Sequence, residues 1–259
     1  MAKLDKRTNA WRDDLADVAL QGMVEATRFV APSLAEVRMP VVPLSRAPRH
    51  DSMQVSQALF GEKVKVFAEE AGWAWVQLAE DSYVGYLPAE ALARDIVEPS
   101  HRVAVPLTHA YPAPDLKSAP AVALPLNARL RVTETSGPYA RLATGGYVFT
   151  AHLRPEGAHE SDPVAVAEKF LHAPYLWGGK SIHGLDCSGL VQLAFQAIGR
   201  NCPRDSDMQE RELGARLESN SISGLRRGDL VFWDGHVGIM RDGETLIHAN
   251  GHHMLTVAE

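Results

Sequence analysis

Cys187 stands where a reactive thiol would be placed. It follows Asp186 and opens a run in which apolar residues recur every three or four positions, a pattern that predicts one amphipathic helix over residues 187–198. Asp186 occupies the N-cap position and Gly199 would end the helix. Because backbone N–H groups and the positive end of the helix dipole favour a thiolate, this position suits a cysteine nucleophile. The alternative is a buried cysteine that serves as a small apolar residue.

The other cysteine lies in a different setting. Asn201-Cys202-Pro203 reads as a loop without the start of a helix, so we expect Cys202 to be structural or inert. Two cysteines can build neither a disulfide framework nor a four-cysteine zinc site.

A cysteine nucleophile needs a base, and two histidines flank a predicted hairpin. Asp242-Gly243 between apolar runs is a strong hairpin signal, and a turn there would place His236 opposite residue 248 or 249. A two-residue loop would put His236 and His248 on opposite faces of the sheet, whereas a three-residue loop or a bulge would put them on one face. In the second case one imidazole takes the thiol proton and the other holds the first in the correct tautomer.

Two other classes of function compete with a thiol enzyme. A metal-dependent hydrolase could use His248, His252 and His253 as zinc ligands, but the sequence has no HExxH motif and these last two histidines lie in a predicted turn. A module that only binds cell-wall peptides through its β-rich part has no need of Cys187, His236 and His248 together.

The elements that must position these residues form three parts of different composition. Residues 1–35 predict a helical arm, because apolar side chains recur at helical spacing within 13–30 and Pro32 follows. Short strand-like segments and frequent turn residues then predict two small β-barrels, at 36–96 and 97–156.

A weak internal repeat supports the two barrels. Residues 64–92 and 130–153 share the order strand, turn with an aromatic residue, strand, and a return strand that starts with glycine and an aromatic residue. The alternative is two generic β segments that look alike by chance. The third part, residues 157–259, starts with Asp162-Pro163, a helix-start signal, and its last residues read as the start of a strand.

Five short motifs of the third part resemble the NlpC/P60 cysteine peptidases. They are Pro174-Tyr175-Leu176-Trp177-Gly178-Gly179, Asp186-Cys187-Ser188-Gly189, Gly228-Asp229-Leu230-Val231-Phe232-Trp233, His236-Val237-Gly238-Ile239 and Ile247-His248-Ala249. The resemblance implies an α+β fold with a papain-like catalytic domain and no cofactor or metal. It also implies a triad of Cys187 as nucleophile, His236 as base and His248 as the orienting residue. The two upstream units resemble bacterial SH3 domains, the first more closely than the second.

The whole order of units resembles the γ-D-glutamyl-L-diamino acid endopeptidases. This resemblance implies hydrolysis of cell-wall (murein) peptides after γ-D-glutamate, on substrates with a free N-terminal L-Ala, as in peptidoglycan recycling. It implies that Asp186 and Ser188 bind the amino end of the substrate and that Tyr175 lies beside the nucleophile. It further implies that Tyr83 lines the groove from the first SH3-like unit, with Asp51 as a second acidic partner.

The composition excludes several other classes. Of 259 residues, 46% are hydrophobic and 22% are charged, which is typical of a globular protein and not of a disordered one. The net charge of −6 argues against a nucleic-acid partner. The sequence contains no run of about 18 apolar residues, so we expect no membrane-spanning helix. The first residues lack the apolar core of a secretion signal. We therefore expect a cytoplasmic monomer.

Overall fold

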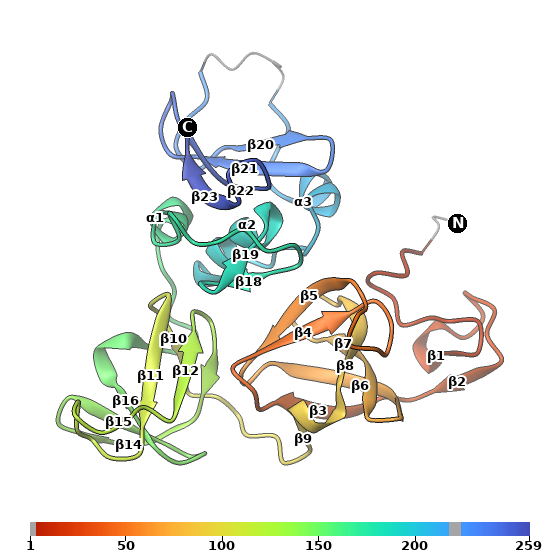
Figure 1. The fold of residues 1–259 in the computed structure, drawn as a ribbon. Coiled ribbons are helices and arrows are strands. Elements are labelled where there is room, and N and C mark those ends of the chain that lie inside the picture. The colour runs from red at the N-terminus through yellow and green to blue at the C-terminus, as the bar shows by residue number, and fades with distance from the viewer. Residues whose placement is uncertain (1–3, 218–223) are drawn as a thin grey trace.

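A computed structural model describes residues 4–217 and 224–259 of the chain. Figure 1 shows an N-terminal arm, two β units side by side, and a C-terminal unit of helices and strands above both. No helix in these two described ranges is long and apolar enough to span a membrane.

The predicted helix in the N-terminal arm is wrong. This stretch forms strand β1 (Leu15–Asp17), a 3-10 turn and strand β2 (Arg28–Val30), and the two strands pair in parallel. Met23, one of the residues at helical spacing, is 64% exposed, so the apolar periodicity has no surface on which to pack. Leu15 instead packs against Phe67 and Trp75 on the outside of the first barrel.

The first barrel is one sheet of seven antiparallel strands in the order β5-β4-β8-β7-β6-β3-β9. Their bounds are β3 Ser33–Val37, β4 Val41–Ser45, β5 Gln54–Leu59, β6 Lys63–Glu70, β7 Trp73–Leu78, β8 Val84–Pro88 and β9 Leu92–Ala93. Alternate valines, alanines and leucines of these strands fill its core. Because β3 belongs to this sheet, the unit begins at Ser33 and not at residue 36 as predicted.

The second β unit contains a five-stranded sheet, β12-β11-β16-β15-β14, and a three-stranded sheet, β13-β10-β17. The bounds are β10 His101–Val103, β11 Leu107–Tyr111, β12 Val122–Pro125, β13 Arg129–Leu130, β14 Val132–Ser136, β15 Tyr139–Leu142, β16 Tyr147–Phe149 and β17 Leu153–Pro155. In both units three strands are followed by a 3-10 turn and a last strand, so the internal repeat is real.

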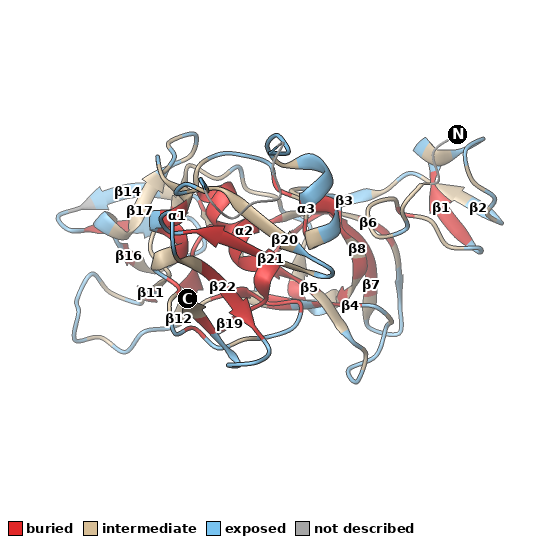
Figure 2. Ribbon diagram, turned by 90° about the horizontal axis from the view of Figure 1, so that it is seen from above, coloured by how far each residue is buried: buried red, intermediate tan, exposed pale blue. Residues whose placement is uncertain are grey.

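The C-terminal unit is α+β, as predicted. Its helices are α1 Pro163–Glu168, α2 Cys187–Ala197 and α3 Ser206–Glu212, and β18 Lys180–Ser181 pairs with β19 Gly184–Leu185. An antiparallel sheet follows in chain order: β20 Leu230–Trp233, β21 His236–Met240, β22 Leu246–Asn250 and β23 Leu255–Ala258. Figure 2 shows α2 and the two central strands of this sheet as its buried layer.

Candidate active site

Cys187 is the first residue of α2, and Asp186 caps the helix as predicted. Asp186 Oδ1 accepts a hydrogen bond from the backbone N–H of Gly189 at 2.7 Å. A Cβ atom on Gly189 would lie 2.2 Å from the carbonyl oxygen of Gly179, so only glycine allows this first turn to pack against the preceding loop. The sequence therefore fixes the thiol at a buried helix start.

The surroundings of Cys187 oppose the thiolate that the helix start was expected to favour. Burial raises the pKa of Cys187, and the nearby Asp186 carboxylate raises it further. Hydrogen bonding from the backbone N–H groups of Val237 and Ser188 acts in the opposite direction but does not offset these effects. The thiol is therefore neutral at neutral pH.

The two histidines lie on one face of the hairpin formed by β21 and β22. Ile239 pairs with Ile247, and the loop between the strands has an odd length, Arg241–Thr245, as predicted for histidines on one face. His236 Nε2 lies 2.8 Å from His248 Nδ1. The predicted register, however, is wrong. The observed pairing continues to place His248 opposite Gly238, so the imidazoles meet diagonally and not directly across.

Two neighbours shape this diagonal contact. Gly238 lies beside His248 and leaves room for the Leu246 side chain, because a Cβ atom there would lie 2.4 Å from Leu246 Cδ1, whereas 3.5 Å from His248 Cβ is an ordinary contact. The ring of Trp233 covers the outer side, with its centroid 5.5 Å from that of His236 and 6.4 Å from that of His248. Burial and the neighbouring His248 lower the pKa of His236, so this imidazole is neutral at neutral pH.

Strand β21 carries the base His236 and also contacts the thiol of Cys187. Val237, whose backbone N–H faces the sulfur of Cys187, directly follows His236 in β21. Since His236 Nε2 bonds to His248, Nδ1 is the ring nitrogen left for the thiol. Within the described residues the thiol and His236 form no direct hydrogen bond. The arrangement is a neutral thiol beside a neutral imidazole, ready for proton transfer when the sulfur attacks.

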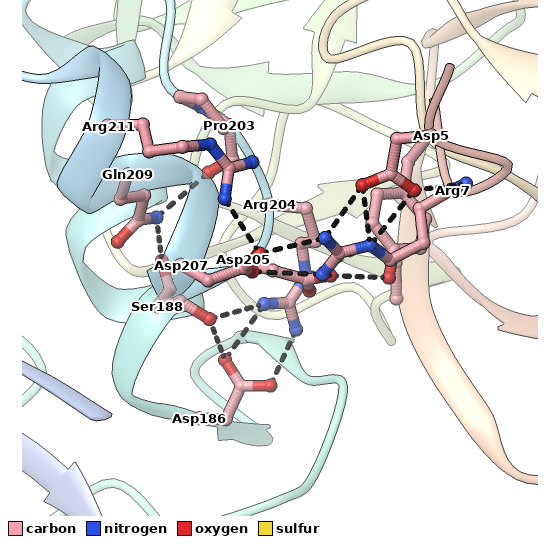
Figure 3. A network of polar contacts seen from close by, with 12 residues as sticks. Asp5, Arg7, Asp186, Ser188, Pro203, Arg204, Asp205, Asp207, Gln209 and Arg211 are labelled. Carbon is pink, nitrogen blue, oxygen red and sulfur yellow. Dashed lines mark hydrogen bonds and ion pairs between the residues drawn. The ribbon is translucent and has the colours of Figure 1, made fainter. Parts of the chain in front are cut away.

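Arg204, which sequence reasoning missed, neutralises the carboxylate beside the nucleophile (Figure 3). It is 1% exposed, and its Nη1 and Nη2 atoms donate to Asp186 Oδ1 and Oδ2 at 2.9 and 2.7 Å. Arg204 also donates to Ser188 Oγ at 2.9 Å and to Ser56 Oγ of the first barrel at 3.1 Å. Asp186 and Ser188 therefore lie together beside Cys187, as predicted, but Arg204 engages the polar atoms of both side chains.

Tyr83 of the first barrel reaches the catalytic unit. It is buried, and its hydroxyl donates to Asp205 Oδ2 at 2.8 Å; burial and this carboxylate raise its pKa well above the usual range. Arg7 from the N-terminal arm donates to the same oxygen at 2.8 Å and pairs with Asp207 (Figure 3). Asp205, adjacent to Arg204 in the chain, is a second acidic residue that sequence reasoning missed.

The first barrel also contacts the segment that leads to Cys187. Lys180, 0% exposed, forms an ion pair with Glu62 Oε1 at 2.9 Å. The backbone N–H of Lys180 donates to Gln57 Oε1 at 2.8 Å, so side chains of the first barrel hold both the backbone and the ammonium group of this residue.

The two remaining predicted substrate residues have different surroundings. Tyr175 bridges to Leu185, and burial, Asp186 and Cys187 raise its pKa, which places it near the nucleophile as predicted. Asp51 lies in the loop after β4 with 78% of its side chain exposed and pairs with Arg49 at 3.5 Å. No contact within the described part of the chain joins Asp51 to the triad, so its role stays a prediction.

Within residues 4–217 and 224–259, neither the remaining histidines nor Cys202 form part of a metal site. Among the described residues no three His, Cys, Asp or Glu side chains are grouped so as to hold a metal ion. His248 uses both ring nitrogens for hydrogen bonds, and His252 stacks edge-on against His253. Cys202 is buried beside Gln209, and burial raises its pKa, which fits an inert cysteine.

Comparisons with known proteins match both parts of this site. Residues 44–92 match the model described as "Bacterial dipeptidyl-peptidase Sh3 domain", and residues 172–259 match the NlpC/P60 family. "Dipeptidyl-peptidase 6" of Lysinibacillus sphaericus is 28% identical over 220 residues, 76% of this chain and 80% of that protein. "Gamma-D-glutamyl-L-lysine dipeptidyl-peptidase" of Bacillus subtilis is 28% identical over 233 residues, 77% of this chain and 73% of that protein.

A solved structure shows the same fold. A crystal structure of an NlpC/P60 family protein from Bacillus cereus superimposes with a TM-score of 0.75 at 21% sequence identity. The superposition covers 88% of this chain and 94% of that one, so it includes most of the described units together.

Proposed function

Because the chain is a cysteine peptidase of the NlpC/P60 family with a bacterial SH3 domain, we propose that it hydrolyses the bond between γ-D-glutamate and an L-diamino acid in cell-wall peptides. The observation that carries the chemistry is the buried thiol at the start of α2, beside the strand that presents His236 to His248. The names of two Bacillus relatives, "Gamma-D-glutamyl-L-lysine dipeptidyl-peptidase", support the choice of bond.

The geometry suits acyl transfer through a thioester. Cys187 Sγ attacks the γ-carbonyl carbon while His236 Nδ1 accepts the thiol proton. His236 then gives this proton to the leaving amine of the diamino acid, and the acyl group remains on the sulfur. A water molecule, deprotonated by His236, hydrolyses the thioester and restores the thiol. His248 keeps the His236 ring oriented through the contact at 2.8 Å.

We further propose that the substrate carries a free N-terminal L-Ala, as released murein peptides do. Tyr83 supports this, because it brings a wall of the first barrel to Asp205, next to the Arg204 that anchors Asp186 and Ser188. Arg204 pairs with Asp186, whose side chain is 10% exposed, and Arg7 pairs with Asp205, whose side chain is 26% exposed. Asp205 is therefore the more accessible of the two carboxylates for a substrate ammonium group. Such a site favours peptide recycling over cleavage of intact sacculi.

Mass spectrometry of L-Ala-γ-D-Glu-diaminopimelate after incubation with the protein tests the proposed bond. We expect L-Ala-γ-D-Glu and free diaminopimelate from the parent chain, and uncut peptide with Cys187→Ala. The L-lysine peptide run in parallel identifies the preferred diamino acid. Cleavage at any other bond, or equal cleavage by Cys187→Ala, would contradict the proposed function.

A further inference from the structure

Nε2 of His248, the ring nitrogen not bonded to His236, has two polar neighbours that require opposite protonation states of it. Glu259 Oε1 lies 2.8 Å from His248 Nε2, and Asn250 Nδ2 lies 2.9 Å from the same atom. A carboxylate accepts hydrogen bonds, so Glu259 requires a proton on Nε2. The amide nitrogen of Asn250 donates, so it requires a lone pair there. No single protonation state of His248 satisfies both neighbours.

A second contact fixes the orientation of the Asn250 amide. Asn250 Oδ1 accepts a hydrogen bond from the backbone N–H of His253 at 2.8 Å. Because a backbone N–H only donates, the atom that faces it is the amide oxygen, and the amide nitrogen then faces His248. The competition at His248 Nε2 is therefore built into the fold.

The outcome of this competition decides what His236 can do. If Asn250 donates to His248 Nε2, the neutral His248 ring carries its proton on Nδ1 and donates it to His236 Nε2. Neutral His236 then carries its own proton on Nδ1, the nitrogen left for the thiol, and cannot accept another there. If His248 Nε2–H instead donates to Glu259, His248 Nδ1 accepts from His236 Nε2–H. His236 Nδ1 then keeps its lone pair.

We propose that Glu259 is a positioning residue that selects the His248 tautomer in which His236 can act as general base. The carboxylate holds the proton on His248 Nε2 against the competing donor, Asn250. This proposal rests on the proposed function in one respect, namely that His236 is the base.

The charges around Glu259 support this role. The hydrogen bond from His248 lowers the pKa of Glu259, so the carboxylate remains an acceptor at neutral pH. His252 and His253 also face it and act in the same direction. At the other imidazole of the His236–His248 pair, the charged group that acts on His236 is Asp186, whose carboxylate raises the pKa of His236.

The first test compares Glu259→Ala with Glu244→Gln, which removes a carboxylate from the exposed loop between β21 and β22. Nitrogen-15 NMR of the histidine side chains reports which ring nitrogen carries the proton, without any substrate. We expect the His248 proton to move from Nε2 to Nδ1 in Glu259→Ala, whereas Glu244→Gln should match the parent. The kcat of Glu259→Ala should fall at least about 10-fold with KM little changed, since orienting residues of triads contribute up to about 10⁴ in kcat.

A double variant separates tautomer selection from plain structural support. Asn250→Ala removes the competing donor, so adding it to Glu259→Ala should restore part of the lost kcat. If both side chains only stabilised the hairpin, the two losses would add. Thermal unfolding checks each variant, and Glu259→Met, which fills the space without an oxygen acceptor, replaces Glu259→Ala if the alanine variant does not fold.

Two results would overturn the proposal: an unchanged His248 tautomer in Glu259→Ala, or a double variant slower than Glu259→Ala. Because the NMR readout needs no substrate, this failure is distinguishable from a failure of the proposed peptidase activity.

Discussion

The two β-barrels have a common order of strands but contact different parts of α2. The first barrel meets the segments that flank the N-terminal end of α2, where Ser56 bonds to Arg204 and Glu62 pairs with Lys180, and its Asp81 accepts a hydrogen bond from Gln192 in the middle of the helix. The second barrel meets the C-terminal half, where Asn127 donates to the Leu193 carbonyl at 3.3 Å and Arg102 to the Gln196 carbonyl at 3.4 Å.

The chemistry of the two interfaces also differs. Besides backbone groups such as the Lys180 N–H, the first barrel contacts particular side chains around the nucleophile, with a buried ion pair among them. The second presents side chains to backbone carbonyls, which any helical sequence would offer. Related folds can therefore take different roles, and we infer that the first barrel is part of the active site while the second supports the scaffold.

The largest expected effect separates the two cysteines near α2. Cys187→Ala should leave the fold intact and lower kcat by several orders of magnitude, about 10⁴–10⁶ by comparison with other lost nucleophiles. Cys202→Ala, the matched control, should retain nearly full activity because the buried Cys202 sulfur bonds to Gln209 and, within the described residues, to no member of the triad. Kinetics on the L-Ala-γ-D-Glu-diaminopimelate peptide measure both. Equal rates for Cys187→Ala and the parent would show that Cys187 is not the nucleophile.

The next effect compares the ion pairs of the two barrels. Lys180→Met leaves the buried Glu62 carboxylate unpaired and should lower the free energy of unfolding by about 3–5 kcal/mol. Arg102→Met removes the more exposed pair with Glu156 and should cost about 1 kcal/mol or less. Urea denaturation of both variants provides the comparison. If Arg102→Met lowers the free energy of unfolding as much as Lys180→Met does, the two interfaces do not differ in the way described.

A smaller difference in kcat/KM is expected between variants of one tyrosine from each barrel. Tyr83→Phe removes the hydroxyl that bonds to Asp205 and should lower kcat/KM on the free peptide about 10-fold, as expected for one hydrogen bond to a charged group. Tyr147→Phe, in β16 of the second barrel, should change kcat/KM less than twofold. If the two variants behave alike, Tyr83 takes no part in substrate binding.

The pH dependence of kcat/KM and of alkylation tests the protonation states of His236 and Cys187. Burial lowers the pKa of His236 below its usual 6.5, so the base stays neutral to lower pH and kcat/KM should decline only below that value. Burial raises the pKa of Cys187, so inactivation by iodoacetamide should accelerate steadily toward alkaline pH. Rapid alkylation that is already constant in mild acid would instead reveal a preformed thiolate–imidazolium pair.

Local signals in the sequence account for the parts of the site that were predicted. The N-cap at Asp186 and the apolar spacing after Cys187 define α2, and the turn at Asp242-Gly243 brings two histidines together. These features depend on residues within one or two elements. The arm helix failed because periodicity alone does not supply a surface on which a helix can pack.

The missed residues depend on contacts between distant segments. Arg204 lies 18 positions after Asp186, and Tyr83 lies 122 positions before Asp205; nothing in either local sequence indicates these partners. Glu259 approaches His248 only because β22 and β23 pair, whereas Asn250 lies two residues after His248 on the same face of β22. Packing, and not local propensity, decides these contacts.

The ratio of kcat/KM for free and N-acetylated L-Ala-γ-D-Glu-diaminopimelate tests most directly whether the first barrel belongs to the active site. Acetylation removes the ammonium charge and adds bulk where Tyr83 and Asp205 meet. We predict that it lowers kcat/KM at least about 100-fold, because a lost charge-assisted contact contributes roughly 1.5–3 kcal/mol and the steric clash adds to it. Comparable values for the two peptides would contradict the account, since the groove would then be open past the alanine and the first barrel would serve another purpose.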